Sequence, residues 1–192
     1  MPIIAVLLLL ALATFPVGAE WRLDNEHSTL SFVTFKKTHV GEVHTFKELG
    51  GTVADDGQLQ IEIALDSVAT NIPIRDKRMR ESLFETQQFT TAKLTGQVDS
   101  AVFDMLEEQP LVAMAVEAEL ALHGEQVPLT LRVDVARLSK EQIFVTSRLP
   151  ALVQADDFNL VKGVEKLREL AGLPSITRTV PVQFALMFNR VE

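Results

Sequence analysis

Few side chains in this sequence have the types and spacing that catalysis or metal binding requires. The 192 residues include no cysteine, which excludes a disulfide, a thiolate zinc site and a cysteine nucleophile. The four histidines, His27, His39, His44 and His123, lie in no recognised zinc motif. His39 and His44 are five residues apart, so they fall on opposite faces of a regular strand. We therefore expect surface or turn roles for the histidines and no metal site.

Asp24, His27 and Ser28 are the residue types of a catalytic triad. They are close neighbours in the sequence, however, whereas the members of a triad meet through the fold. We expect these three residues to form structural hydrogen bonds at the start of a strand, and we assign no catalytic residue.

The densest basic cluster of the chain consists of Arg75, Lys77, Arg78 and Arg80. One interpretation is a solvated helix face with local ion pairs, each worth only a few tenths of a kcal/mol. The other is that one or two of these cations meet an anionic head group at the mouth of an interior. The first interpretation is favoured, because exposed runs of charge are common on protein surfaces.

The elements that must position these residues begin with a strand that leads into a helix. Apolar side chains on alternate positions from Leu59 to Leu65 predict a half-buried strand. Residues 74–84 then place apolar side chains on one side of a short helix. This side is formed by Ile74, Met79, Leu83 and Phe84. The strand and the helix both need a shared interior.

The rest of the chain reads mainly as antiparallel strands. A short edge strand is expected over 21–24 and glycine-interrupted strand pieces over 40–53. Further strands are expected over 28–35, 91–98, 111–122, 127–135, 142–154 and 180–188. Asp55-Asp56-Gly57 predicts a hairpin turn and Pro150 a bulge or an edge position. A second helix is expected over 161–170, with Asp156 and Asp157 as N-cap candidates.

These elements predict an all-β domain of about eight or more antiparallel strands with two short helical inserts, as in barrels and sandwiches. A closed eight-stranded sheet can be filled by its own side chains or can hold one small apolar ligand. The alternation of apolar side chains does not choose between these two interiors.

The first 19 residues carry no charged side chain and are rich in aliphatic residues, which is typical of a secretory signal peptide. We expect cleavage after Ala19. A retained membrane anchor is the alternative, although the apolar run is shorter than the roughly 20 residues of a span. Removal of 19 of the 192 residues leaves 173, enough for one domain over 20–192. The net charge of −8 argues against nucleic acid or an anionic membrane surface as the main partner.

Three segments of the chain are distinctive together, residues 23–32 (LDNEHSTLSF), 74–84 (IRDKRMRESLF) and 122–129 (LHGEQVPL). In their order and spacing they resemble the YceI-like family, the lipocalin-like polyisoprenoid-binding proteins of bacteria. The resemblance implies an antiparallel, lipocalin-like β-barrel with an extended apolar channel. It also implies export to the periplasm and the binding of a long isoprenoid or related amphiphile.

Given this resemblance, we expect the barrel interior to bind a polyisoprenoid, an isoprenoid quinone or a similar lipid. The expected ligand-binding residues are Phe32, Phe46, Ile61, Ile63, Met79, Phe84, Val116, Leu131, Phe184, Phe188 and Arg75. The helix over 74–84 is interpreted as a lid or plug at one end of the barrel. Arg75 and Asp76 are expected mainly to fix this lid, with contact of Arg75 to a head group as the second role.

Three hypotheses for function follow from these observations. The leading one is a non-enzymatic carrier or sequestering protein in the periplasm, with no cofactor and no stable insertion in the membrane. The second is an accessory or stress-response partner of a membrane redox protein, in which ligand binding is incidental. The third is an enzyme that acts on an isoprenoid through His27 or Asp76. Whether two chains form a homodimer is left open.

Overall fold

The computed structural model of the chain describes residues 20–37 and 39–191. The predicted signal peptide, residues 1–19, lies outside the described residues. The strands are β1 (Glu20–Lys36), β2 (Val40–Phe46), β3 (Leu49–Ala54), β4 (Gln58–Ala64), β5 (Val68–Ala69), β6 (Thr91–Gln97), β7 (Leu111–Leu122), β8 (Glu125–Arg137), β9 (Gln142–Ser147), β10 (Ala151–Gln154) and β11 (Thr179–Val191). The helices are α1 (Pro73–Arg78), α2 (Ala101–Glu108) and α3 (Val161–Leu170). Short helical turns are η1 (Leu65–Ser67), η2 (Met79–Leu83) and η3 (Ala155–Phe158).

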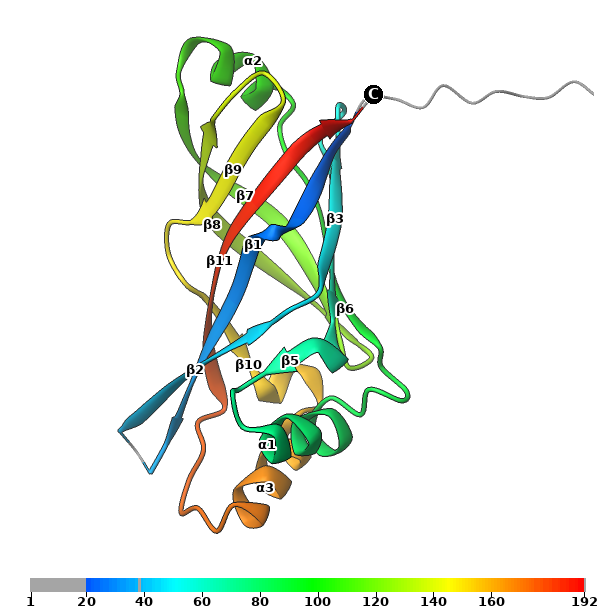
Figure 1. Cartoon of the computed structure of the whole chain (residues 1–192), viewed down its shortest axis with the longest axis vertical. Helices are drawn as coiled ribbons and strands as arrows, with labels where there is room; N and C mark the ends of the chain where they lie inside the picture. The colour runs from blue at the N-terminus through cyan, green and yellow to red at the C-terminus, as the bar shows by residue number, and fades with distance from the viewer. Residues whose placement is uncertain (1–19, 38, 192) are drawn as a thin grey trace, which may run out of the picture.

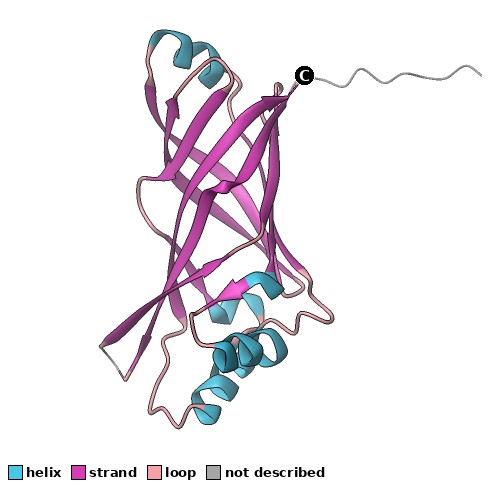
Figure 2. Cartoon of the chain, in the orientation of Figure 1, coloured by secondary structure: helices cyan, strands magenta, loops and turns pink. Residues whose placement is uncertain are grey.

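Eight of the strands close into an antiparallel barrel. Each strand pairs with the next in the order β1, β3, β4, β6, β7, β8, β9 and β11, and β11 pairs again with β1. The remaining strands β2, β5 and β10 extend the wall at one end, as Figure 1 shows. The helices lie at the two ends of the barrel and not around its sides (Figure 2). The prediction of an all-β antiparallel barrel is confirmed.

The first strand is long because it belongs to both halves of the wall. Its first residues, Glu20–Arg22, pair with β3, and Leu30–Lys36 pair with β2. The other edge of β1 pairs with β11, with a break in register between Asp24 and Thr29. The prediction of a separate edge strand over 21–24 was therefore wrong. This segment has a neighbour on each side, and Trp21 within it is buried.

The tight turns agree with the sequence pattern. His123 and Gly124 both have positive φ, 51° and 87°, and they form a two-residue turn between β7 and β8. This geometry matches the right-handed twist of the paired strands. Gly57, with φ 87°, closes the predicted hairpin between β3 and β4.

Two predictions about the second half of the chain were wrong. The single strand expected over 142–154 is divided into β9 and β10, which both pair with β11 at different heights. Pro150 lies in the break, where its missing N–H costs no ladder hydrogen bond. The helix predicted over 161–170 is confirmed as α3, but Asp156 and Asp157 are not its N-cap, because they belong to the separate turn η3.

One helix, α2, was not predicted. It covers the end of the barrel opposite α1 and α3 (Figure 1). Val102 and Leu106, four residues apart, are buried in the apolar core, and the Asp99 side chain accepts a hydrogen bond from the Ala101 N–H. The four-residue spacing was a signal in the sequence, but the segment is short and flanked by turn residues.

Candidate functional site

The barrel surrounds a cavity of about 520 Å³. Every one of the eight barrel strands contributes to its lining, through the face on which apolar side chains alternate. On β11, for example, this face consists of Val180, Val182, Phe184, Leu186 and Phe188. Compact protein interiors contain few voids larger than one water molecule. The alternating strands therefore build a hollow interior and not a filled one.

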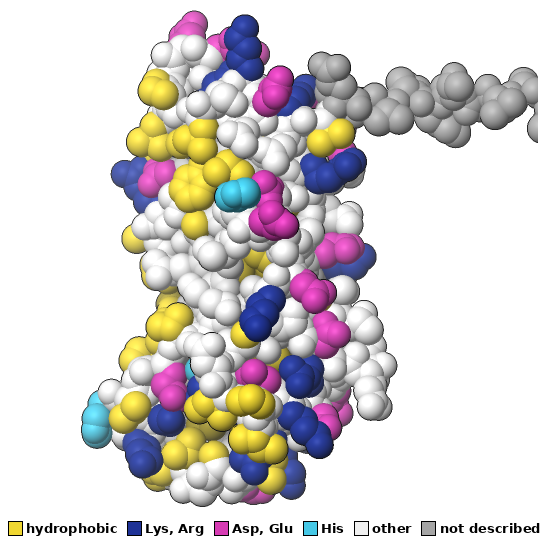
Figure 3. All heavy atoms as spheres, in the orientation of Figure 1, with side chains coloured by type: hydrophobic (Ala, Val, Ile, Leu, Met, Phe, Trp, Pro, Cys, Tyr) yellow, Lys and Arg dark blue, Asp and Glu magenta, His cyan; other side chains and the backbone are white. Residues whose placement is uncertain are grey.

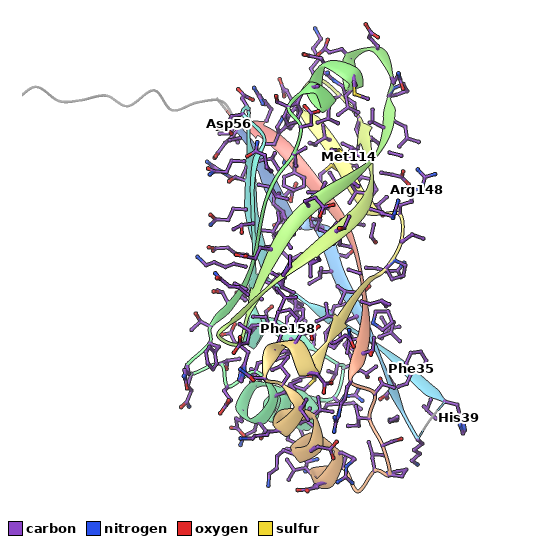
Figure 4. All side chains as sticks on the ribbon, turned by 180° about the vertical axis from the view of Figure 1, so that it is seen from behind. Phe35, His39, Asp56, Met114, Arg148 and Phe158 are labelled. Carbon is purple, nitrogen blue, oxygen red and sulfur yellow. The ribbon has the colours of Figure 1, made fainter. Side chains whose placement is uncertain are left out.

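All eleven residues expected to bind the ligand line this single cavity. They are Phe32, Phe46, Ile61, Ile63, Met79, Phe84, Val116, Leu131, Phe184, Phe188 and Arg75. Met114, which is labelled in Figure 4, lines it as well. The structure thus brings together strands and a helix from the whole chain. Contact of these residues with a ligand remains a prediction.

Aromatic rings gather at one end of the cavity. The ring centres of Phe32 and Phe46 are 5.4 Å apart, and those of Phe46 and Phe84 are 5.7 Å apart. Phe158 is fully buried beneath this end but does not reach the cavity (Figure 4). Phe32, Phe46 and Phe84 thus belong to the cavity wall, whereas Phe158 belongs to the solid core.

The helical segment predicted as a lid, α1 with η2, lies across this aromatic end of the barrel (Figure 1). Met79 and Phe84 are buried and face the cavity. The helix α3 packs against η2, and Gly163 permits the close approach. A Cβ atom at Gly163 would lie 2.6 Å from the Ser82 carbonyl oxygen and 2.8 Å from the Leu83 Cα.

Arg75 and Asp76 hold the lid to the barrel wall. The Arg75 guanidinium donates to Glu42 Oε2 on β2 at 2.7 Å and to the Thr70 carbonyl oxygen at 2.8 Å. Asp76 Oδ1 accepts hydrogen bonds from the Thr70 N–H, at 2.8 Å, and from the Thr70 hydroxyl. The expected role of both residues in fixing the lid agrees with these contacts.

Glu42 is shared between two cations. Lys36 Nζ lies 2.9 Å from its Oε1, and Arg75 Nη1 contacts its Oε2. Burial alone would raise the pKa of Glu42, but the hydrogen bonds from Lys36 and Arg75 outweigh burial and lower this pKa below its usual value. Glu42 is therefore charged at neutral pH, and it neutralises part of the positive charge at the lid.

The buried position of His44 contradicts the surface or turn role that was expected for it. It lies on β2 with 3 % of its surface exposed, and it lines the cavity. Its Nε2 is 3.0 Å from the Thr34 hydroxyl, and its ring meets the edge of Phe32. Burial, reinforced by the charge of Arg75, lowers the pKa of His44, so the imidazole is neutral at pH 7. The sequence alternation could have placed His44 inward, on the same face as Phe46.

Two buried polar atoms at this end of the cavity have no hydrogen-bond partner among the residues that the structure describes. They are His44 Nδ1 and Arg75 Nε. Such orphaned atoms are rare in folded proteins, because an unmade hydrogen bond in the interior is costly. All polar side chains of the cavity lining belong to this lid end. They are Thr34, Lys36, Glu42, His44, Arg75, Arg78 and Thr177.

The triad-type residues Asp24, His27 and Ser28 lie outside the cavity lining. The Asp24 carboxylate contacts His27 Nδ1 at 2.9 Å, and this hydrogen bond is the main reason that the pKa of Asp24 is lowered. The Ser28 hydroxyl donates to the Asp24 carbonyl oxygen and accepts from the Met187 N–H. These bonds stabilise the register break in β1, so the contacts agree with the structural role expected for them.

Within residues 20–37 and 39–191, no group of three or more histidine and acidic side chains is arranged to hold a metal ion. In the same ranges, no helix combines the length and the apolar character that crossing a bilayer requires.

Comparison with known proteins gives one family match and several similar structures. Residues 21–188 match the model of the YceI-like domain. A polyisoprenoid binding domain from Saccharophagus degradans, implicated in plant cell wall breakdown, shares 41 % identity with this chain. The match covers 88 % of this chain and 97 % of that domain, with a TM-score of 0.85. No curated protein matches the sequence.

Two more distant structures share the fold. Burkholderia cenocepacia BcnA is 18 % identical, with coverage of 86 % of this chain and 98 % of that one, and a TM-score of 0.66. The YCEI protein of Campylobacter jejuni is 14 % identical, with coverage of 78 % and 85 % and a TM-score of 0.57. At these identities the likeness concerns the fold alone.

Proposed function

The chain belongs to the YceI-like domain family, and we propose that it is a non-enzymatic periplasmic protein that carries or sequesters a long apolar lipid. The single observation that supports this most is the cavity of about 520 Å³, which extends along the barrel and is apolar except at the lid end. This volume is within the range of about 300–1,000 Å³ that is typical of small-molecule sites. The similarity to a polyisoprenoid binding domain points to the same class of ligand.

The energetics of an apolar ligand fit this proposal. Burial of each CH₂ group contributes roughly 0.8 kcal/mol, so a polyisoprenoid tail has ample free energy of transfer into the channel. Part of this free energy offsets the cost of association. A lipid that is insoluble in water needs such a binding site to cross an aqueous compartment, and binding requires no chemical step. Export of the protein through the apolar segment 1–19 belongs to the same proposal.

The polar lid end is the proposed site of the ligand's head group, with the tail along the apolar body of the barrel. His44 Nδ1 and Arg75 Nε offer buried polar atoms without a partner. The Arg75 guanidinium and the Lys36 ammonium are both already paired with the Glu42 carboxylate. A small, uncharged polar head group therefore suits this end better than a head group of high negative charge.

Replacement of a lining side chain by a charged one tests the carrier function. Phe184→Asp places a carboxylate in the apolar channel, where its desolvation is costly. We expect the affinity for a prenyl alcohol to fall on the order of 100-fold, or about 3 kcal/mol. The measurement is displacement of a fluorescent fatty acid or prenyl probe from the purified protein.

The matched control is Phe144→Asp. Phe144 is not part of the cavity lining, although its neighbours Ile143 and Val145 are. This variant should bind the prenyl alcohol like the wild-type protein. Circular dichroism of both variants checks that the barrel is intact. Equal affinities of a folded Phe184→Asp protein and the wild type would contradict binding in the barrel.

A further inference from the structure

Charge is distributed very unequally along the barrel. Three segments form the outer surface of the lid end, residues 35–43 without the undescribed residue 38, residues 72–83 and residues 161–178, and we call them the lid-end surface. They contain ten of the 18 basic residues but only five of the 26 acidic residues, a net charge of +5. Since the whole chain has a net charge of −8, the remainder carries −13. Figure 3 shows the Lys and Arg side chains gathered at this end.

Several cations of the lid-end surface face solvent. Lys37, Lys77, Lys162 and Lys166 are exposed. Lys77 has only a loose contact with Glu81, at 3.8 Å. Such exposed ammonium groups interact with an external anionic surface more readily than cations that are already paired within the protein.

Large apolar side chains are exposed on the same surface. Val43 is 63 % exposed and Ile74 is 54 % exposed. Other exposed members are Phe35, Val40, Ile72 and Leu170. Figure 3 shows apolar side chains interspersed with basic ones at this end, and Phe35 belongs to the β1–β2 hairpin that projects from the barrel in Figure 4. Basic and apolar side chains together are the composition of a surface that binds a lipid interface.

The cavity reaches solvent at the lid-end surface. In the described part of the chain, three residues of the cavity lining are exposed to solvent, namely Ile72, Ile74 and Ala171. All three lie at this end, on the segment leading into α1, on α1 and after α3. A ligand that enters or leaves by the shortest path therefore passes across the exposed apolar side chains.

We propose that the lid-end surface docks on the surface of a bilayer that contains anionic phospholipids. Its Lys and Arg side chains attract the lipid phosphates, and Val43, Ile72 and Ile74 enter the head-group region. The strongly acidic remainder is repelled by the same membrane, so the barrel is oriented with its mouth toward the bilayer. The net charge of −8 does not exclude contact with a membrane surface, because the sum over the chain hides the positive charge of the lid end.

Docking would allow the apolar ligand to exchange with the bilayer, and this purpose rests on the proposed function. The docking of the lid-end surface on a bilayer does not depend on that function. A bilayer fits the surface better than an acidic protein does, since a bilayer supplies both the anionic layer and the hydrocarbon phase from which an apolar ligand must come.

Sedimentation with lipid vesicles tests the docking. The full chain without residues 1–19 is mixed with vesicles of phosphatidylcholine alone, or of phosphatidylcholine and phosphatidylglycerol in equal amounts. We expect the protein to sediment with the anionic vesicles, to remain in solution with phosphatidylcholine alone, and to be released by high salt, because salt screens surface charges. Equal behaviour with both kinds of vesicle would overturn the proposal.

Two double variants locate the contact. Lys77→Glu with Lys166→Glu reverses two charges on the lid-end surface, and Lys93→Glu with Lys140→Glu makes the same change in net charge elsewhere. The pairs are matched, because Lys77 and Lys93 each lose one exposed ion pair, with Glu81 and Glu62. We expect the first double variant to lose most of its vesicle binding, at least fivefold, and the second to retain it. Equal losses would show nonspecific attraction and contradict docking by the lid end.

A second measurement keeps the two proposals separate. Loading with a prenyl alcohol added from ethanol, without vesicles, should be the same for both double variants. A protein that sediments with anionic vesicles but takes up no prenyl alcohol would refute the carrier function and leave the docking intact. A protein that takes up the prenyl alcohol but does not sediment with anionic vesicles would refute the docking alone. Capture by an acidic protein with no vesicle binding would also refute the docking.

Discussion

At the scale of single residues, His44 and Arg75 decide what the polar end of the cavity can recognise. The imidazole is held by Thr34 through Nε2, which leaves Nδ1 directed at no protein partner. Arg75 donates from its two terminal nitrogens to Glu42 and Thr70, and its buried Nε has no partner among the described residues. Arg75 therefore fixes the lid, and each of the two residues still offers one buried hydrogen-bonding atom to a head group.

Replacement of His44 by Phe tests this assignment. The new ring keeps the edge contact with Phe32 but has no hydrogen-bonding atom. A lost hydrogen bond contributes roughly 0.5–1.5 kcal/mol. We expect the affinity for a prenyl alcohol to fall about 3- to 10-fold, and the affinity for squalene, which has no head group, to remain unchanged. Isothermal titration or probe displacement measures both.

His39→Phe is the control, since His39 is exposed on the β1–β2 hairpin and does not line the cavity. It should change neither affinity. If His44→Phe weakened the binding of squalene as much as that of the alcohol, the effect would be one of packing and the head-group assignment would be wrong.

At the scale of elements, the lid depends on how closely α3 approaches η2. Gly163 lies at this contact, where a Cβ would meet two backbone atoms of the lid at 2.6 Å and 2.8 Å. Backbone atoms cannot rotate away as a side chain can. The structural requirement for glycine here is therefore the approach of the two helices, and not a special backbone angle.

Gly163→Ala should separate α3 from the lid. We expect a loss of about 1–3 kcal/mol in the free energy of unfolding from overpacking, which exceeds the ~0.5–1 kcal/mol that alanine gains within a helix. Urea denaturation measures this difference, provided that the m value, the slope of the unfolding free energy against urea concentration, is the same for the variant and the wild type. Gly50→Ala is the control, because a Cβ at Gly50 meets no atom within 4 Å. Equal stabilities of the two variants would show that the contact between α3 and η2 is not tight.

At the scale of the whole molecule, the sequence predicted the wall of the barrel better than its ends. Alternation from Leu59 to Leu65 and from Val180 to Phe188 depends only on local spacing, and it predicted the inward faces correctly. Closure depends on the pairing of β1 with β11, which are far apart in the sequence, and only the family resemblance implied it. Most of the residues predicted to bind the ligand lie on such inward strand faces and therefore line the cavity.

The features that the sequence did not predict, the contacts of His44, the helix α2 and the uneven charge, depend on tertiary contacts. Alternation with Phe46 indicates only that His44 faces inward, whereas its hydrogen bond with Thr34 and the nearby charge of Arg75 follow from the fold. The helix α2 is short, and the apolar side chains that bury it come from distant strands. The uneven charge becomes visible only when the β1–β2 hairpin, α1 and α3 meet at one end.

The content of the cavity is the most direct test of the central claim that the barrel holds a lipid. The protein is expressed with residues 1–19, purified without detergent, extracted with organic solvent and analysed by mass spectrometry. We predict a stoichiometric amount of a long apolar lipid in the extract of the wild-type protein and its absence from that of Phe184→Asp. A wild-type protein that contains no lipid and takes up no added prenyl lipid would contradict the account.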